Sequence, residues 1–285
     1  MLGVVIVAYK NPKRTADYIN NQLSKLTCPY IVVVVNNASS FQECQELASL
    51  CGGTACDSEE YIGPKGIYIV HSSVNLGFAK GNNLGVEVLN RNNPCDYLLF
   101  TNDDIILPNP TNLTPLINHL RNNSDIGAIG PDIVDLDGHH QSPHRKVISP
   151  YRQIGWTLLK KFRKRRVKVC SDSPVPVEGP CYWVSGAFFL MSEPDFTAVN
   201  GFDPDTFLYG EEPILAEKLK KLGKYMYFYP HLRVNHLAGA AIKNAFKSKV
   251  IRQIVAESNC VYYRKYLKSP AVVIALYKFL VKFSS

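Results

Sequence analysis

Residues 3–9, Gly-Val-Val-Ile-Val-Ala-Tyr, form a run that is apolar and rich in β-branched side chains. Such a run is typical of a strand buried on both faces, as in parallel sheets. A second run of this kind, Ile31–Val35 (IVVVV), follows a segment with apolar residues at helical spacing. Asn11 and Pro12 supply the N-cap and first-turn signals of that helix. The chain therefore opens with a β-α-β unit, which predicts a parallel, right-handed arrangement.

The same reading extends along the chain and predicts an α/β protein. We expect a Rossmann-like, mostly parallel central sheet flanked by helices, with a C-terminal helical extension. Residues 135–150 are polar and predict a long loop. Further strands are predicted at 66–71, 96–101, 126–129, 182–191 and 225–229, and helices at 80–90, 212–222, 245–268 and 271–283.

The charge of the chain is unevenly distributed. The net charge is +8, yet residues 158–168 hold seven basic residues and no acid, and residues 247–282 hold eight basic residues and one acid. The remainder of the 285 residues is mildly acidic. Two basic segments on an acidic body predict docking to an anionic surface, either membrane or nucleic acid, although a solvated charged face has the same composition.

Apolar runs are short throughout the sequence. No window reaches 18 apolar residues, and residues 2–8 lack the length and basic flank of a signal peptide. We therefore expect a cytoplasmic protein with reduced thiols and no membrane-spanning segment.

A candidate metal site follows the predicted strand at 96–101, at Thr101-Asn102-Asp103-Asp104. Ligands of open α/β sheets bind beyond the carboxyl ends of strands, and adjacent carboxylates suit Mg²⁺ or Mn²⁺. The alternative is a plain turn, for which Asn and Asp are equally suited.

A candidate ligand loop, Asn75–Gly85 (NLGFAKGNNLG), follows the predicted strand at 66–71. Three glycines and three asparagines at a strand-to-helix junction suit close backbone approach to a phosphate or a sugar. The spacing is not that of a dinucleotide-binding GxGxxG loop, and an ordinary loop is the alternative.

A candidate general base lies at Glu211-Glu212, at the start of a predicted helix. The helix dipole favours an ionised carboxylate at that position, as a base for an alcohol requires. Simple helix capping is the alternative. His236 follows a predicted strand and is either a ligand or a hydrogen-bonded core histidine.

Taken in order, these motifs resemble glycosyltransferase family 2, in particular its bacterial rhamnosyltransferase-like group, which has the GT-A fold. The resemblance spans about residues 3–268. The motifs that carry it are Val5–Asn11, Val35–Ser40, Asn75–Gly85, Thr101–Asp104, Ser185–Leu190 and Gly201–Gly239.

The resemblance implies an inverting hexosyl- or rhamnosyltransferase. Its donor would be a UDP- or dTDP-linked sugar, and its acceptor a hydroxyl on a lipid-linked or growing cell-surface glycan. Glu212 falls on the family's base, with Glu211 beside it. Asp103 falls on the metal-binding acid of a site for Mg²⁺ or Mn²⁺, with Asp104 beside it. His236 falls on the histidine that completes the metal or diphosphate site. The implied donor-binding residues are Ala8, Tyr9, Asn11, Asn36, Asn37, Asn75, Gly77, Phe78, Gly81, Asn83, Asn102, Gly186 and Ala187.

The sequence departs from the family pattern at several positions. Asn36 stands where the family has a base-recognising Asp, which leaves the choice of nucleotide open. Ile214 replaces the second acid after the Glu pair, Lys218 replaces the usual Arg, and Thr101 opens the metal motif.

The resemblance also implies a division of the chain. Residues 1–240 would form the GT-A domain, with a nucleotide-binding half at about 1–106 and an acceptor half at about 107–240. Residues 241–285 would form the helical extension. Its last helix is too short to cross a bilayer, so we expect it to lie in the inner face of the cell membrane with Lys278 and Lys282 reaching phosphates, or to be a last core helix.

Two other function classes remain at this stage. A metal-dependent sugar nucleotidyltransferase would share the acidic site, but residues 9–12 lack its glycine-rich phosphate loop. A nucleic-acid-binding protein would interleave aromatic and basic residues on one platform, whereas here the basic residues cluster away from the motif loops. We therefore expect no nucleic-acid partner, and the oligomeric state stays open.

Overall fold

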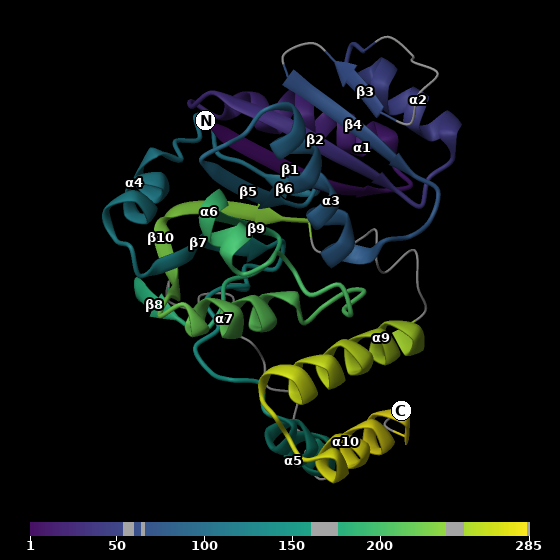
Figure 1. Cartoon of the computed structure of the whole chain (residues 1–285), viewed down its shortest axis with the longest axis vertical. Helices are drawn as coiled ribbons and strands as arrows, with labels where there is room; N and C mark the ends of the chain where they lie inside the picture. Colours follow the sequence, from purple (N-terminus) through teal and green to yellow (C-terminus); the bar gives the residue numbers. More distant parts are fainter. Residues whose placement is uncertain (54–59, 64–65, 161–175, 238–247, 284–285) are drawn as a thin grey trace.

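The computed structural model describes residues 1–53, 60–63, 66–160, 176–237 and 248–283, and one mixed sheet organises them (Figure 1). Its strands lie in the order β3-β4-β2-β1-β5-β9-β7-β10-β6, and β8 pairs with β10. The strands are β1 Leu2–Tyr9, β2 Tyr30–Asn37, β3 Glu60–Gly63, β4 Ile67–Ser72, β5 Tyr97–Thr101, β6 Ile105–Ile106, β7 Ile126–Asp135, β8 Gly179–Cys181, β9 Phe188–Ser192 and β10 Tyr225–His236.

The opening β-α-β unit is the parallel centre of this sheet. Strand β1 pairs in parallel with β2 on one side and β5 on the other, and β4 extends the parallel set beyond β2. Strand β9 then joins β5 and β7 in antiparallel fashion, and β7 pairs in parallel with β10. Because β9 runs backwards, its first residues lie at the carboxyl end of β5, where the acidic motif begins.

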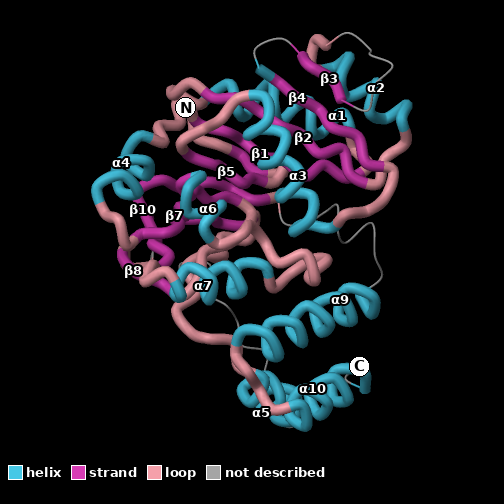
Figure 2. The backbone as a smooth tube through the Cα atoms, viewed as in Figure 1, coloured by secondary structure: helices cyan, strands magenta, loops and turns pink. Residues whose placement is uncertain are grey.

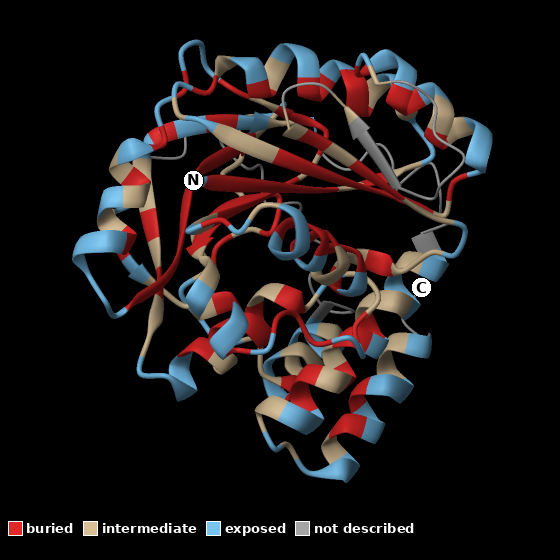
Figure 3. Ribbon diagram, turned by 45° about the horizontal axis from the view of Figure 1, so that its top comes forward, coloured by how far each residue is buried: buried red, intermediate tan, exposed pale blue. Residues whose placement is uncertain are grey.

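Helices cover both faces of the sheet, which explains why its central strands are apolar on both sides. Val4 and Ile6 of β1 pack toward α1, α2 and α4, whereas Val5 packs toward α3, α6 and α7. Figure 3 shows the buried central strands with helices on either side. The helices are α1 Pro12–Asp17, α2 Phe41–Leu50, α3 Gly77–Asn92, α4 Thr114–Asn122, α5 Pro150–Lys160, α6 Glu193–Ala198 and α7 Glu211–Lys221.

The C-terminal helices form a third layer. These are α9 Ser248–Val261, the π-helical turn η4 Tyr262–Tyr266 and α10 Ala271–Phe283. They share a small core with Ile154 of α5 and Ile214 of α7. Figures 1 and 2 show α5 beside α10 at the end of the molecule opposite β3 and α2. The helical extension thus recruits α5 from the preceding part of the chain.

Most predicted elements are confirmed to within a few residues. The strand predicted at 182–191 is wrong in its first half, because β9 begins at Phe188 and residues 182–187 instead bond to other segments. Strand β10 continues seven residues past the predicted end at Tyr229. The start of the helix predicted at 245–268, most of the basic stretch at 158–168 and the proposed boundary at 240 lie outside the described residues.

Candidate active site

The Glu pair begins α7, directly after Gly210 in the left-handed conformation. Glu212 accepts a hydrogen bond from the backbone amide of Gly186, with 2.9 Å between N and Oε1. Burial raises the pKa of Glu212, and this amide and its own backbone amide work against that rise. A carboxylate that is partly exposed, has a raised pKa and is held by one amide is suited to accept a proton.

Glu211 has a different environment from its neighbour. It is 3% exposed. Burial and the adjacent Glu212 charge raise its pKa to about 8, which outweighs hydrogen bonds from its own amide and from Thr206. The sequence predicted ionisation through the helix dipole, but desolvation is the larger effect here. Glu211 is therefore the inner, mostly neutral member of the pair near pH 7.

A second group gathers at the carboxyl end of β5. Nε2 of His236, at the end of β10, lies 3.0 Å from Oδ1 of Asp104 and 3.5 Å from the side-chain amide of Asn102. The other ring nitrogen, Nδ1, lies 2.7 Å from Oε1 of Gln141 and donates to it. A hydrogen bond of this kind orients a histidine so that its Nε2 lone pair faces a metal.

The group fits a divalent cation. Nε2 of His236 and Oδ1 of Asp104 face each other at 3.0 Å. Neighbouring ligands of a six-coordinate ion with bonds of about 2.1 Å are themselves roughly 3 Å apart. One carboxylate, one imidazole and one amide also form a donor set suited to Mg²⁺ or Mn²⁺.

Asp103, the other acid of the motif, points elsewhere. Its two oxygens receive Arg14 at 2.7 Å and the Thr15 hydroxyl at 2.6 Å, both from α1. Burial raises its pKa although Arg14 and Thr15 lower it. Asp103 therefore anchors α1 beneath the motif, and the structure brings Asp104, not Asp103, to His236.

One short segment connects Glu212 to the group around His236. Gly186 donates to Glu212, and the carbonyl oxygen of the next residue, Ala187, accepts from the backbone amide of Asn102 at 3.0 Å. Two consecutive residues before β9 thus contact both halves of the candidate site.

The glycines of the Asn75–Gly85 loop make close contacts with the protein itself. Gly77 has a φ of +70°, and a β-carbon there would lie 2.1 Å from the Phe207 carbonyl oxygen. Gly81 lies against Val7 and Gly85 against Val5, so α3 packs closely on β1. These glycines set the position of α3 at the edge of the site.

The asparagines and Phe78 of this loop also tie segments together. Asn37 accepts from the Leu76 amide at 2.8 Å and donates to Asn75 at 3.0 Å. Asn83 exchanges two hydrogen bonds with the backbone of Phe202, and the Phe78 ring stands edge-on to the Phe202 ring.

The remaining predicted donor residues lie at the carboxyl ends of β1 and β2. Ala8 and Asn36 are 2% exposed, and Tyr9 is half-buried. Asn11 caps α1 through the Arg14 amide. The side-chain amide of Asn36 is buried beside Cys44 of α2, with whose thiol it forms a hydrogen bond.

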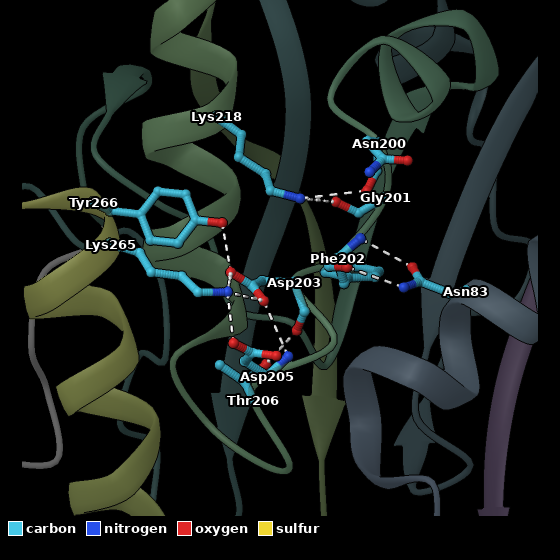
Figure 4. A network of polar contacts seen from close by, with 10 residues as sticks. All are labelled: Asn83, Asn200, Gly201, Phe202, Asp203, Asp205, Thr206, Lys218, Lys265 and Tyr266. Atoms are coloured by element: carbon cyan, nitrogen blue, oxygen red, sulfur yellow. Dashed lines mark hydrogen bonds and ion pairs between the residues drawn. The ribbon is translucent and has the colours of Figure 1, made fainter.

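The loop that leads into the Glu pair is held by the C-terminal layer (Figure 4). Asp203 is 4% exposed and receives the Tyr266 hydroxyl at 2.6 Å and the Lys265 ammonium at 3.1 Å. Burial raises the pKa of Asp203, but bonds from Tyr266, the Asp205 amide and Lys265 outweigh it, so the pKa lies below its ordinary value. Lys265 also bonds Asp205 at 2.7 Å.

Further contacts extend this attachment along the same loop. The Ser258 hydroxyl of α9 donates to the Leu208 carbonyl at 3.0 Å. The Tyr182 hydroxyl lies 2.5 Å from that of Tyr262 and donates to Glu217 of α7 at 2.6 Å. The C-terminal helices thus fix both the loop before α7 and the side of α7.

Sequence reasoning missed Gln141, Arg14 and the Asp203 attachment. Gln141 lies in the polar loop that was predicted without function, and its only signal was that loop's polar composition. A separate acidic group, Asp135, Asp137 and His139, also lies after β7, but amides of Asp137 and His139 bond Asp135 as in an ordinary turn.

Comparison with known protein families identifies the family to which this chain belongs. Residues 3–182, more than half of the chain, match the family described as Glycosyl transferase family 2. The chain belongs to glycosyltransferase family 2. It is accordingly a glycosyltransferase that uses a nucleotide sugar, and it is rhamnosyltransferase-like. The family match favours this function over the nucleotidyltransferase and nucleic-acid-binding alternatives.

Two curated relatives agree with this assignment. The chain is 28% identical over 253 residues to rhamnosyltransferase WbbL of Escherichia coli, with 84% of each protein covered. It is 28% identical over 144 residues to the N-acetylglucosaminyl-diphospho-decaprenol L-rhamnosyltransferase of Mycobacterium tuberculosis, a match that spans half of this chain and 47% of that protein.

Solved structures confirm the GT-A fold of this transferase. The mannosyltransferase PcManGT of Pyrobaculum calidifontis, solved with GDP-Man and Mn²⁺, aligns with a TM-score of 0.57 over 98% of this chain and 69% of its own. GalNAc-T7, solved with UDP, GalNAc and Mn²⁺, aligns with a TM-score of 0.59 over 98% of this chain and 54% of its own. Both are 14% identical in sequence, so the likeness concerns the fold.

Proposed function

We propose that this enzyme transfers a sugar with inversion, using Glu212 as base and a divalent cation held by Asp104, His236 and Asn102. The observation that carries the proposal is the connection through Gly186 and Ala187, which contact Glu212 and Asn102 in turn. Structural neighbours solved with a nucleotide and Mn²⁺ support the cation. When bound, the cation supplies positive charge beside the departing diphosphate.

In this proposal, side chains and backbone amides of the protein accept the proton of the acceptor hydroxyl and orient the base. Glu212 takes the proton of the acceptor hydroxyl while that oxygen attacks the anomeric carbon, on the face opposite the diphosphate. The Gly186 amide holds the carboxylate in one orientation throughout. A proton on Glu211 leaves a single negative charge in the pair when Glu212 is ionised, so Glu212 accepts a proton without a second charge beside it.

We assign the donor to the carboxyl ends of β1 and β2. The half-buried Tyr9 and the half-buried Asn102 can reach a ligand from this edge, whereas Asn36 lies buried beneath it. Residues Asn75–Gly85 then contribute indirectly, because they hold α3 against β1 and bond the loop that follows Gly201. In the same way Asp103 acts through Arg14 and α1, without direct contact to the cation.

We further propose a lipid-linked acceptor, and hence work at the inner face of the cell membrane. The decaprenol-linked substrate in the name of the mycobacterial relative supports this. Among the described residues, no helix is both long enough and apolar enough to cross a bilayer. We retain residues 1–240 as the GT-A domain and 241–285 as the helical extension, with α5 packed against the extension.

A ligand screen tests the donor and the cation together. Nucleoside diphosphates and their sugars are added with Mn²⁺, with Mg²⁺ or with a chelator, and the thermal unfolding midpoint is recorded. A ligand that binds only the folded chain raises the midpoint by mass action. We expect one nucleotide to stabilise the protein in the presence of a cation only. Stabilisation that is equal with the chelator would contradict the cation site.

A further inference from the structure

Helix α5 exposes apolar side chains on the side turned away from its core contact. Ile154 packs into the core shared with the C-terminal helices. Trp156 is 55% exposed and Leu159 56%, and both lie on the opposite side of the helix. The Arg152 guanidinium lies over the Trp156 ring, 4.7 Å from its centroid. The outward side of α5 thus carries two exposed apolar side chains, and one of them, Trp156, has a cation over its ring.

Helix α10 repeats this pattern. Its inward side chains, Ile274 and Tyr277, are 4% exposed, whereas Val272 and Leu276 on the other side are 74% and 47% exposed. Lys278 is also exposed, and its position four residues after Ile274 places it at the margin between the inward and outward sides. A helix that exposes apolar side chains flanked by lysines is typical of helices that lie in a membrane interface.

Both helices belong to parts of the chain without acids. The sequence has no Asp or Glu between Gly138 and Ser171, and none from Ser258 to Ser285. Helices α5 and α10 contact each other at one end of the molecule (Figure 1). An apolar surface with positive charge and no negative charge complements a bilayer that contains anionic phospholipid.

We propose that α5 and α10 together form a docking face for an anionic bilayer. Trp156, Leu159, Val272 and Leu276 enter the headgroup region, and Lys278 reaches lipid phosphates. Pairing of this face with a second copy is the alternative occupant. It would place these cations against their own equivalents, with no carboxylate in either helix to neutralise them.

From the sequence, we expect only the last helix to lie in the membrane interface. The proposed face is larger, because α5, residues 150–160, forms half of it. The proposed lipid-linked acceptor explains why the enzyme would dock on a membrane, and to that extent this proposal rests on the proposed function. Vesicle binding is measured without donor, cation or acceptor, so its failure is distinguishable from failure of the proposed reaction.

Trp156 supplies the first measurement, since the chain has only two tryptophans. The other, Trp183, is stacked on His144 with 3.4 Å between ring centroids. On mixing with phosphatidylcholine vesicles that contain phosphatidylglycerol, we expect the emission to shift to shorter wavelength and to be quenched by brominated lipid. The shift should be absent with pure phosphatidylcholine vesicles and absent in Trp156→Phe.

Sedimentation with the same vesicles gives the second measurement. Leu159→Glu combined with Leu276→Glu should lower binding at least about tenfold, because each carboxylate opposes insertion and anionic lipid. Leu50→Glu, at an exposed leucine on α2 at the other end of the molecule, is the matched control and should bind normally. Activity on a short, water-soluble acceptor should persist in both variants.

Two outcomes would overturn the proposal. One is vesicle binding by the double variant equal to that of the unmodified chain. The other is a dimer of the unmodified chain in solution that the double variant dissociates, which would identify a second copy as the occupant. If the double variant loses its circular dichroism, Lys278→Gln with Lys282→Gln replaces it, and unchanged binding to the anionic vesicles then counts against docking.

Discussion

The amide of Gly186 donates to Oε1 of Glu212 at 2.9 Å, and a β-carbon on Gly186 would lie 2.7 Å from that same oxygen. A side chain on Gly186 would therefore force the carboxylate of the proposed base to move. The residue is needed for its lack of a side chain, since no positive φ is recorded for it. A hydrogen bond made in this way holds the carboxylate without any side chain entering the space beside it.

Gly186→Ala should displace the Glu212 carboxylate and lower kcat by roughly tenfold to a hundredfold, because a misplaced base contributes much less rate enhancement. Nucleotide binding, measured by calorimetry, should be unchanged. Gly155→Ala is the matched control, because a β-carbon there meets nothing within 4 Å. A kcat equal to that of the unmodified enzyme would show that this contact does not position the base.

Substitution of the two aspartates of the acidic motif should have different effects, one on cation-dependent binding and the other on folding stability. Asp104→Asn should weaken cation-dependent nucleotide binding by about tenfold to a hundredfold or more, with little effect on the unfolding midpoint. Asp103→Asn leaves the Arg14 guanidinium without its buried partner and should cost roughly 3 kcal/mol of folding free energy. Calorimetry and chemical unfolding of both variants measure this, and a reversed pattern would make Asp103 the cation ligand.

The raised pKa of Glu211 predicts a specific pH dependence of stability. The folded chain keeps a proton on Glu211 up to about pH 8, whereas an ordinary glutamate loses it near 4.5. Between these values the folded state binds the extra proton, so its stability falls as pH rises, by up to about 1.4 kcal/mol per pH unit. Glu211→Gln should remove this part of the slope in chemical unfolding. Glu46→Gln, at an exposed site on α2, should keep it.

The attachment of the C-terminal layer to the loop before α7 should affect turnover more than nucleotide binding. Lys265→Met combined with Tyr266→Phe removes two of the partners of buried Asp203. We expect a lower unfolding midpoint and a kcat reduced by about tenfold, with nucleotide affinity unchanged. Lys265→Arg should restore part of the loss, and Lys249→Met at the start of α9 should have no effect. An equal loss of nucleotide affinity would indicate general loosening of the fold.

The sequence predicted the sheet well because its central strands carry local signals. Residues 3–9 and 31–35 are apolar on both faces, and only a parallel sheet covered by helices buries both. Strands β6 and β8 have two and three residues, too few for a periodic pattern. They form because longer neighbours, chiefly β10, offer backbone partners.

The site was predictable in outline and not in its contacts. The acidic motif and the Glu pair stand out by residue type and position. The partners that distinguish Asp103 from Asp104 come from Arg14 and His236, residues far from the motif in sequence. The state of Glu211 depends on desolvation by the whole fold, which outweighs the local helix dipole. A local sequence pattern therefore predicts neither the partners of the two aspartates nor the raised pKa of Glu211.

The antiparallel course of β9 has a consequence for how the enzyme assembles its chemistry. The atoms that contact Glu212 and Asn102 belong to adjacent residues of one chain segment, Gly186 and Ala187. The peptide bond between these two residues, together with the two hydrogen bonds, limits how far the proposed base can move from the proposed cation site. If Glu212 and the Asp104–His236 group act as proposed, this link holds the two parts of the site in register before substrates bind.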